Sequence, residues 1–200
     1  IESAVSVTGG SLSNWSPVSN TVYTATFTPD TNSTTDGVIH VANDKFSDAA
    51  GNNNKDEKDA NNTVTFTVDT VRPTIAITDD DPDNSLSAGD TATLTFTLSE
   101  ASTNFIESAV SVTGGSLSNW SPVSNTVYTA TFTPDTNSTA DGVIHVANGK
   151  FSDAAGNNNK DEKDANNTCT FTIDTRTKEE EKHCFTGNLI SNSDFIITNK

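Results

Sequence analysis

Hydrophobic and polar residues alternate along several short stretches of this chain. In residues 91–98 (TATLTFTL), Leu94, Phe96 and Leu98 alternate with threonines, which is the period-two pattern of a strand with one buried face. Helical periodicity is absent from the sequence. Similar alternation recurs in residues 74–78, 109–113, 126–133, 142–148 and 167–174, with a shorter extended stretch near 117–120. The pattern therefore predicts an all-β protein.

Turn-forming residues separate these predicted strands. Glycine, proline, asparagine and aspartate gather at residues 79–84, 114–115, 134–137 and 156–159, where they favour tight turns. About seven short strands in roughly 105 residues is the size and spacing of an immunoglobulin-like Greek-key β-sandwich.

The chain contains a tandem repeat, because residues 1–70 recur as residues 106–175. Such similarity indicates copies of one domain-sized unit. Within the 70 aligned pairs only four differ: Thr35 and Ala140, Asp44 and Gly149, Val64 and Cys169, Val68 and Ile173.

The first copy lacks the two strands that residues 71–105 place ahead of the second. To fold back onto the first copy, the chain would have to return along a strand of about 25 Å. The link at residues 70–72 can span only about 10 to 14 Å. We therefore expect 71–175 to form a complete sandwich and 1–70 an incomplete one with an uncovered core face. In the alternative, residues 195–198 fill that gap, while 176–200 otherwise form a divergent charged tail or linker.

The inward positions of the complete copy predict its core. Trp120 is expected to pack at one edge of this core. Cys169 lies in the inward register of the last strand, so we expect a small buried hydrophobe and no disulfide with Cys184. The predicted core residues are Ile75, Ile77, Leu94, Phe96, Leu98, Tyr128, Phe132 and Phe171.

The chain is acidic, and its hydrophobic content is low but sufficient for small sandwich cores. Hydrophobic residues make up 32% of the chain, and the formal net charge is -16. An acidic surface repels phosphate, which argues against nucleic acid or anionic lipid as partners. The sequence holds no apolar run of about 18 residues that would span a membrane.

Signatures of catalysis are missing from the sequence. His40 and His145 have no neighbouring Cys or His at ligand spacing, so each is interpreted as a strand histidine rather than a zinc ligand. No G-x-S-x-G elbow and no glycine-rich phosphate loop occurs. We therefore expect that the protein is not an enzyme.

Several motifs together resemble the bacterial immunoglobulin-like repeats of giant secreted adhesins and biofilm proteins. These motifs are SDAAGN before the last strand, FTVDTVRPTIAIT across the junction, SAGDTATLTFTLSEA, VTGGSLSN and YTATFTPDT. The resemblance covers residues 1–175 and implies an extended stalk outside the cell. It also implies that acidic residues at the domain poles and linkers bind calcium.

The sandwich topology indicates where such a calcium site lies. Glu100 follows the second strand of the complete copy, Asp153 precedes its last strand, and Asp69 lies in the linker. These three segments meet at one pole, so we expect the carboxylates to converge and to bind calcium with help from Asn157–Asn159 carbonyls. The alternative interpretation is a solvated acidic surface.

Two further acidic groups are interpreted separately. Residues 79–83 carry four aspartates, which we expect at the opposite pole with Asp135 and Asp141. Asp161, Glu162 and Asp164 are interleaved with lysines, and we expect them to form a solvated surface.

Two functional classes follow from the sequence. The first is a stalk or spacer module of a large extracellular adhesin, with neighbouring immunoglobulin-like repeats as its partners and calcium as its cofactor. The second is a module that binds a glycan or a host protein through its loops. The near-verbatim repetition favours the first, because a spacer gains from number whereas a binding tip is usually single.

Overall fold

The computed structural model describes residues 2–56, 60–161 and 165–177, which contain β-strands and short 3-10 turns. The all-β class predicted from the alternation is confirmed. The strands are β1 (Val5–Thr8), β2 (Gly10–Pro17), β3 (Tyr23–Pro29), β4 (Gly37–Val41), β5 (Thr63–Phe66), β6 (Ile75–Asp79), β7 (Ser85–Ser87), β8 (Ala92–Leu98), β9 (Ser111–Thr113), β10 (Gly115–Pro122), β11 (Val127–Pro134), β12 (Gly142–His145) and β13 (Thr168–Asp174).

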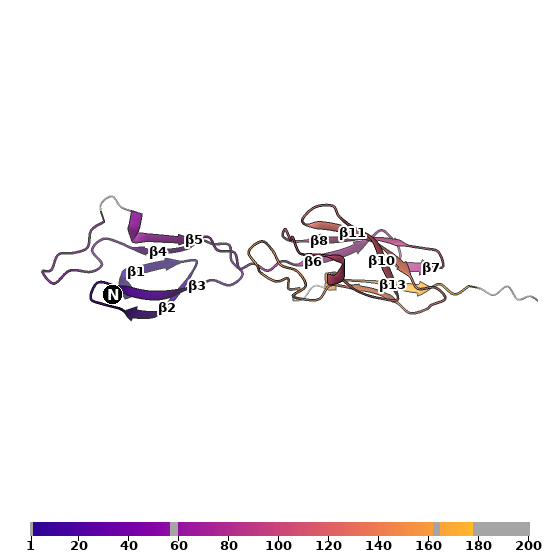
Figure 1. Cartoon of the computed structure of the whole chain (residues 1–200), viewed down its shortest axis with the longest axis horizontal. Helices are drawn as coiled ribbons and strands as arrows, with labels where there is room; N and C mark the ends of the chain where they lie inside the picture. Colours follow the sequence, from indigo (N-terminus) through magenta and orange to yellow (C-terminus); the bar gives the residue numbers. More distant parts are fainter. Residues whose placement is uncertain (1, 57–59, 162–164, 178–200) are drawn as a thin grey trace, which may run out of the picture.

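Strands β6 to β13 form two four-stranded sheets (Figure 1). One sheet has the order β10-β11-β8-β6 and the other β7-β13-β12-β9. Phe96 of β8 lies opposite Ile77 of β6 on one side and Tyr128 of β11 on the other. The strands supplied by residues 71–105 therefore pair within the second copy, as the length of the linker predicted.

The first strand of this sandwich changes sheets partway along. β6 pairs antiparallel with β8, whereas β7 pairs parallel with β13, with Leu86 opposite Ile173. The sequence pattern missed β7 because three residues are too few to show an alternation. A second change of sheet occurs at Gly114, between β9 and β10, where φ is +71° and an added Cβ would overlap the carbonyl of Asp141. Only glycine adopts that conformation without strain.

The core between the two sheets contains all eight residues predicted for it, each buried. The sequence reasoning missed Phe105, which lies in the loop before β9 and is 2% exposed. Its ring makes edge-to-face contacts with Phe96, Tyr128 and Phe151 at centroid distances of 5.9, 5.0 and 5.2 Å. Trp120 packs half-buried against this aromatic cluster, 5.3 Å from Phe96.

Cys169 is a buried thiol in the inward register of β13, as expected. Its Sγ donates a hydrogen bond to Asp79 Oδ2 at 3.3 Å. Burial, and then the contact with Asp79, raises the pKa of the thiol to about 12. Cys184 lies outside the described residues, so the absence of a disulfide stays a prediction.

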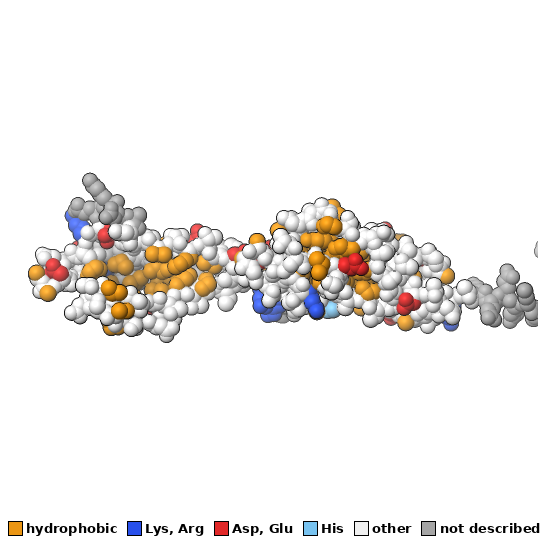
Figure 2. Space-filling view, viewed as in Figure 1, with side chains coloured by type: hydrophobic (Ala, Val, Ile, Leu, Met, Phe, Trp, Pro, Cys, Tyr) orange, Lys and Arg blue, Asp and Glu red, His pale blue; other side chains and the backbone are white. Residues whose placement is uncertain are grey.

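Strands β1 to β5 form a smaller unit (Figure 1). A three-stranded sheet, β1-β4-β5, faces the two-stranded hairpin β2-β3. Within the described residues, β3 pairs only with β2 and β5 only with β4. Hydrophobic side chains gather on the resulting open face (Figure 2), and Val64 and Phe66 are 51% and 46% exposed.

Candidate metal centre

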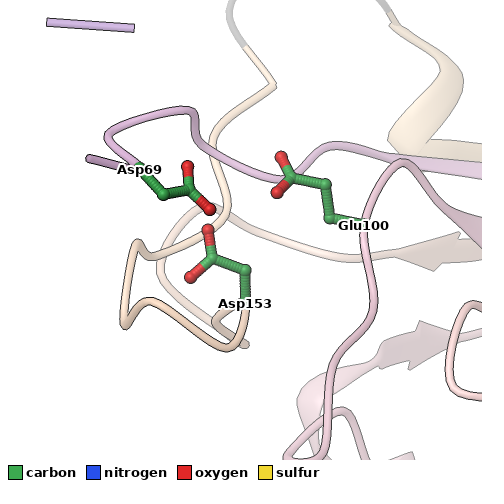
Figure 3. Close-up of side chains that lie close together, drawn as sticks. All are labelled: Asp69, Glu100 and Asp153. Atoms are coloured by element: carbon green, nitrogen blue, oxygen red, sulfur yellow. The ribbon is translucent and has the colours of Figure 1, made fainter. Parts of the chain in front are cut away.

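Three carboxylates converge where the linker meets the second sandwich. Asp69 lies between β5 and β6, Glu100 follows β8, and Asp153 lies in the loop between β12 and β13. One oxygen from each lies within 4.8 Å of the others, and Figure 3 shows the three groups pointing toward one another. The convergence predicted from the order of the loops is therefore confirmed.

Asp153 is held by its own loop. Its Oδ1 accepts a hydrogen bond from the Asn157 backbone N–H at 2.8 Å, and its Oδ2 accepts one from Asn157 Nδ2 at 2.9 Å. Asn157 Nδ2 also donates to the backbone carbonyl of Asp69 at 3.1 Å. Sequence reasoning offered Asn157 as a calcium ligand through a carbonyl, whereas its side chain ties the loop to the linker.

Asp69 is oriented by the chain that follows it. Its Oδ1 accepts a hydrogen bond from the Val71 N–H at 3.1 Å, which fixes the carboxylate against the linker backbone. The linker is itself attached on both sides. Thr70 exchanges hydrogen bonds with Ser33 of the first repeat, and the Pro73 carbonyl accepts one from the Lys160 N–H of the second at 3.0 Å.

Glu100 is the least well stabilised carboxylate of the three. Its Oε1 is buried and has no hydrogen-bond partner among the described residues. Burial raises the pKa of Glu100, and the negative charges of Asp69 and then Asp153 raise it further. A carboxylate that has lost water and faces two like charges is stabilised either by a proton or by a cation.

The Asn159 side chain has a different role from the one expected for it. The side chain is 1% exposed. Its Oδ1 accepts backbone hydrogen bonds from Lys150 and Phe151 at 2.6 and 3.1 Å, and its Nδ2 donates to the Ala147 carbonyl at 3.1 Å. Asn159 therefore closes the base of the loop, and its amide has no capacity left for a metal. The run of three asparagines gave no signal that would separate their roles.

The aspartates of residues 79–83 do not gather into a comparable site. Asp79 Oδ1 accepts the Asp81 N–H at 3.0 Å, and Asp80 Oδ1 accepts the Thr93 N–H at 2.6 Å. The bond from Thr93 lowers the pKa of Asp80. Over the described ranges, the only convergent group of three or more metal-ligating side chains is that of Asp69, Glu100 and Asp153. The second cluster therefore shapes the turn between β6 and β7.

Asp161 is also less solvated than expected. Its Oδ1 accepts a hydrogen bond from the Ile75 N–H at 3.2 Å, so it contacts the start of β6. Glu162 and Asp164 lie outside the described residues. His145 and His40 lie close to strand threonines, with Nδ1 2.9 Å from Thr168 Oγ1 and 2.8 Å from Thr63 Oγ1 respectively.

The fold and its two copies agree with what comparison with known proteins finds. A family model described as "Bacterial Ig-like domain" matches residues 2–66 and 69–173. The chain belongs to this family of bacterial Ig-like domains, which confirms the resemblance drawn from the sequence motifs.

Among solved structures, the chain is similar to FdeC, described as a broadly conserved Escherichia coli adhesin. The identity is 17% and the TM-score 0.45, over 85% of this chain and 52% of that one. The present chain thus spans about half the length of that relative. None of the curated proteins matches the chain. The described residues include no helix of the length and apolarity needed to cross a membrane.

Proposed function

We propose that the chain is a stalk module of a large extracellular bacterial adhesin, and that a calcium ion held by Asp69, Glu100 and Asp153 stiffens the junction between its two repeats. The observation that carries this proposal is the approach of the three carboxylates to within 4.8 Å, together with the buried and unpartnered Oε1 of Glu100. An acidic cluster alone would be consistent with solvated surface. A buried carboxylate oxygen without a donor, facing two other carboxylates, is relieved by a proton or by a cation, and we assign the cation.

The donor set suits calcium. Calcium takes about six to eight oxygen ligands at about 2.3 to 2.6 Å, and carboxylates from separate loops supply them in a flexible geometry. The three carboxylates offer one converging oxygen each, and water or backbone carbonyls would complete the shell. We expect a dissociation constant of about 10⁻⁴ to 10⁻³ M, as in other extracellular modules.

The position of the cluster explains how binding would stiffen the chain. Asp69 belongs to the first-repeat side, because the next residue, Thr70, is tied to Ser33. Glu100 and Asp153 belong to loops of the second repeat. Only Val71 and Arg72 separate Thr70 from Pro73, which is attached to Lys160. A cation bound by all three carboxylates would therefore bridge a two-residue hinge.

The near-verbatim repetition and the end-to-end arrangement of the two units (Figure 1) support a spacer role. In a stalk, each added repeat makes the protein longer. The length grows in proportion to the number of repeats only if the junctions between them are rigid. Neighbouring repeats of the same chain are the partners in this proposal, and the cell surface is its location.

The test compares calcium with chelator in the full 200-residue chain. Calcium at a hundred times its dissociation constant should stabilise the folded state by about 2.7 kcal/mol, measured by thermal unfolding. It should also narrow the distribution of overall dimensions measured by small-angle X-ray scattering. Asp153→Asn should abolish both effects.

Asp48→Asn is the matched control for this variant. Asp48 occupies the corresponding loop of the first repeat and accepts the same hydrogen bonds from Asn52, from its N–H and its Nδ2, each at 2.9 Å. No metal-ligating group includes it among the described residues. The Asp48→Asn protein should therefore keep the full response to calcium. Equal melting temperatures and scattering with calcium and with chelator in the unsubstituted protein would disprove the proposal.

A further inference from the structure

The open face of the first repeat forms a hollow of about 710 Å³. Aromatic and aliphatic side chains line it, including Leu12, Trp15, Tyr23, Phe27 and Phe66. Figure 2 shows hydrophobic side chains running along this unit. An apolar surface of this kind on a soluble domain indicates a contact surface.

The second repeat shows what covers the same residues. Phe66 is 46% exposed, whereas its counterpart Phe171 is fully buried; Tyr23 is 36% exposed and its counterpart Tyr128 only 5%. The residues that cover this face in the second repeat come from the stretch 75–105. They include Leu86, Leu94, Phe96 and Phe105, each 2% exposed or less.

The backbone edges of the first repeat match this cover. In the second repeat, β11 pairs with β8 from Val127↔Thr97 to Phe132↔Ala92. The corresponding edge of β3 has no partner strand among the described residues. Likewise β13 pairs in parallel with β7, whereas the equivalent edge of β5 is unpaired in that range. Unpaired N–H and C=O groups at a sheet edge accept an added strand.

We propose that the open face of residues 1–70 is a docking groove for one additional segment with the sequence pattern of residues 73–105. Its longer strand would pair antiparallel with β3, its short strand would pair parallel with β5, and its Phe105 equivalent would pack on Trp15 and Tyr23. Specificity would come from the apolar alternation of the segment, and the backbone edges would set its register.

A second copy of this chain does not satisfy the requirement. Residues 1–200 hold one segment of this kind and two faces that accept it. Exchanging the segment between two chains therefore leaves one face open per chain, with no gain in buried surface. The groove requires a segment beyond the one that already completes the second repeat.

The first experiment adds a synthetic peptide of residues 73–105 to the full 200-residue protein. We expect saturable binding of one peptide per chain by calorimetry. Tryptophan emission should shift to the blue, because Trp15 would gain contacts like that of Trp120 with Phe96, whose ring centroids are 5.3 Å apart. A peptide carrying Phe96→Asp should not bind.

Two variants of β3 form the matched pair on the protein side. Ala25 lines the hollow, and its counterpart Ala130 lies opposite Leu94 and is 2% exposed. Ala25→Glu should therefore abolish binding. Thr28→Glu introduces the same charge at an exposed position of the same strand that does not line the hollow, so it should leave binding unchanged.

A fusion gives a second measurement that does not depend on the solubility of the peptide. Residues 71–105 placed directly before residue 1 reproduce the connection found before the second repeat. Amide exchange in residues 63–68 should then slow to the rate of residues 168–173, and mass spectrometry separates these segments because Val64 and Cys169 differ. The same fusion with Phe96→Asp should show no slowing.

Three results would overturn the proposal. The first is an unchanged exchange rate in the fusion. The second is peptide binding that survives Ala25→Glu. The third is a dimer, detected by analytical ultracentrifugation, that Ala25→Glu dissociates and that the peptide cannot compete with, since the occupant would then be a second copy packed face to face.

Discussion

The two repeats have nearly the same sequence and different environments. Phe151 is 2% exposed and its counterpart Phe46 is 49% exposed; Cys169 is 6% exposed where Val64 is 51% exposed. The first strand of the hairpin nonetheless has equivalent bounds in both, with β2 at Gly10–Pro17 and β10 at Gly115–Pro122, whereas β13 runs to Asp174 and β5 ends at Phe66. Local alternation and turns thus set most of the strand positions. The burial of a side chain depends instead on residues 71–105, which cover the hydrophobic face of the second repeat but not that of the first.

The same contrast holds for the loops that precede the last strands. Asp48 with Asn52, and Asp153 with Asn157, make the same side-chain hydrogen bonds. Only Asp153 meets two other carboxylates in the described part of the chain. A local sequence therefore builds the loop, and the linker with Asp69 and the loop after β8 with Glu100 convert it into a candidate site.

The largest expected difference between the repeats is in their cores. Phe171→Ala should destabilise the second repeat by about 3 to 5 kcal/mol, because it leaves a cavity in a packed core. Phe66→Ala should cost about 1 kcal/mol, because the ring is already half in water. Amide exchange of residues 168–173 and 63–68, resolved by mass spectrometry, measures each loss. Equal losses would show that the first repeat is packed as tightly as the second.

A smaller effect on stability is expected from Glu100→Gln. The substitution should raise the melting temperature in chelator and lower it in calcium. Because the pKa of Glu100 is raised in the folded state, the folded protein binds this proton more tightly than the unfolded chain does. In chelator, the corresponding stability is present below the ordinary pKa of the carboxyl and is lost as pH rises through the raised value. Glu100→Gln removes this loss.

The measurement is the melting temperature of the two proteins from pH 4 to pH 8. In chelator at pH 7, Glu100→Gln should melt higher than the unsubstituted protein, because it removes the repulsion from Asp69 and Asp153. In calcium the order should reverse, because a ligand is lost. Glu107→Gln is the control, since Glu107 is exposed and belongs to no carboxylate cluster in the described chain. If the same protein melted higher both in calcium and in chelator, Glu100 would not act as a calcium ligand that repels Asp69 and Asp153 when the ion is absent.

The smallest change in stability is expected at the position where the repeats carry cysteine and valine. Cys169→Val should alter the free energy of unfolding by less than about 1.5 kcal/mol, because the volume is nearly conserved. The thiol should also resist alkylation at pH 9, since it is buried and its pKa is about 12.

Val64→Cys provides the matched comparison, because this position is 51% exposed on the equivalent strand. Its thiol should react rapidly with iodoacetamide in the folded protein, whereas Cys169 should react only after denaturation in urea. Peptide mapping by mass spectrometry assigns each modified site. Rapid labelling of Cys169 in the folded protein would show that the second core opens far more readily than its packing indicates.

The sequence by itself determined most of the strands, though not β7, as well as the repeat and the pairing of residues 71–105 with the second copy. It did so because alternation has a fixed period in strands and because three linker residues have a limited reach. The same reasoning placed Asp69, Glu100 and Asp153 at one pole, since strand order decides which loops meet.

Only the tertiary structure decided how individual side chains are used. It assigned Asn159 to the loop backbone, turned the Asn157 side chain toward the linker, and brought Phe105 from a loop into the aromatic core. It also left Glu100 Oε1 buried without a donor among the described residues. These outcomes depend on contacts between segments far apart in the chain, and neither composition nor period records which neighbour each polar atom finds.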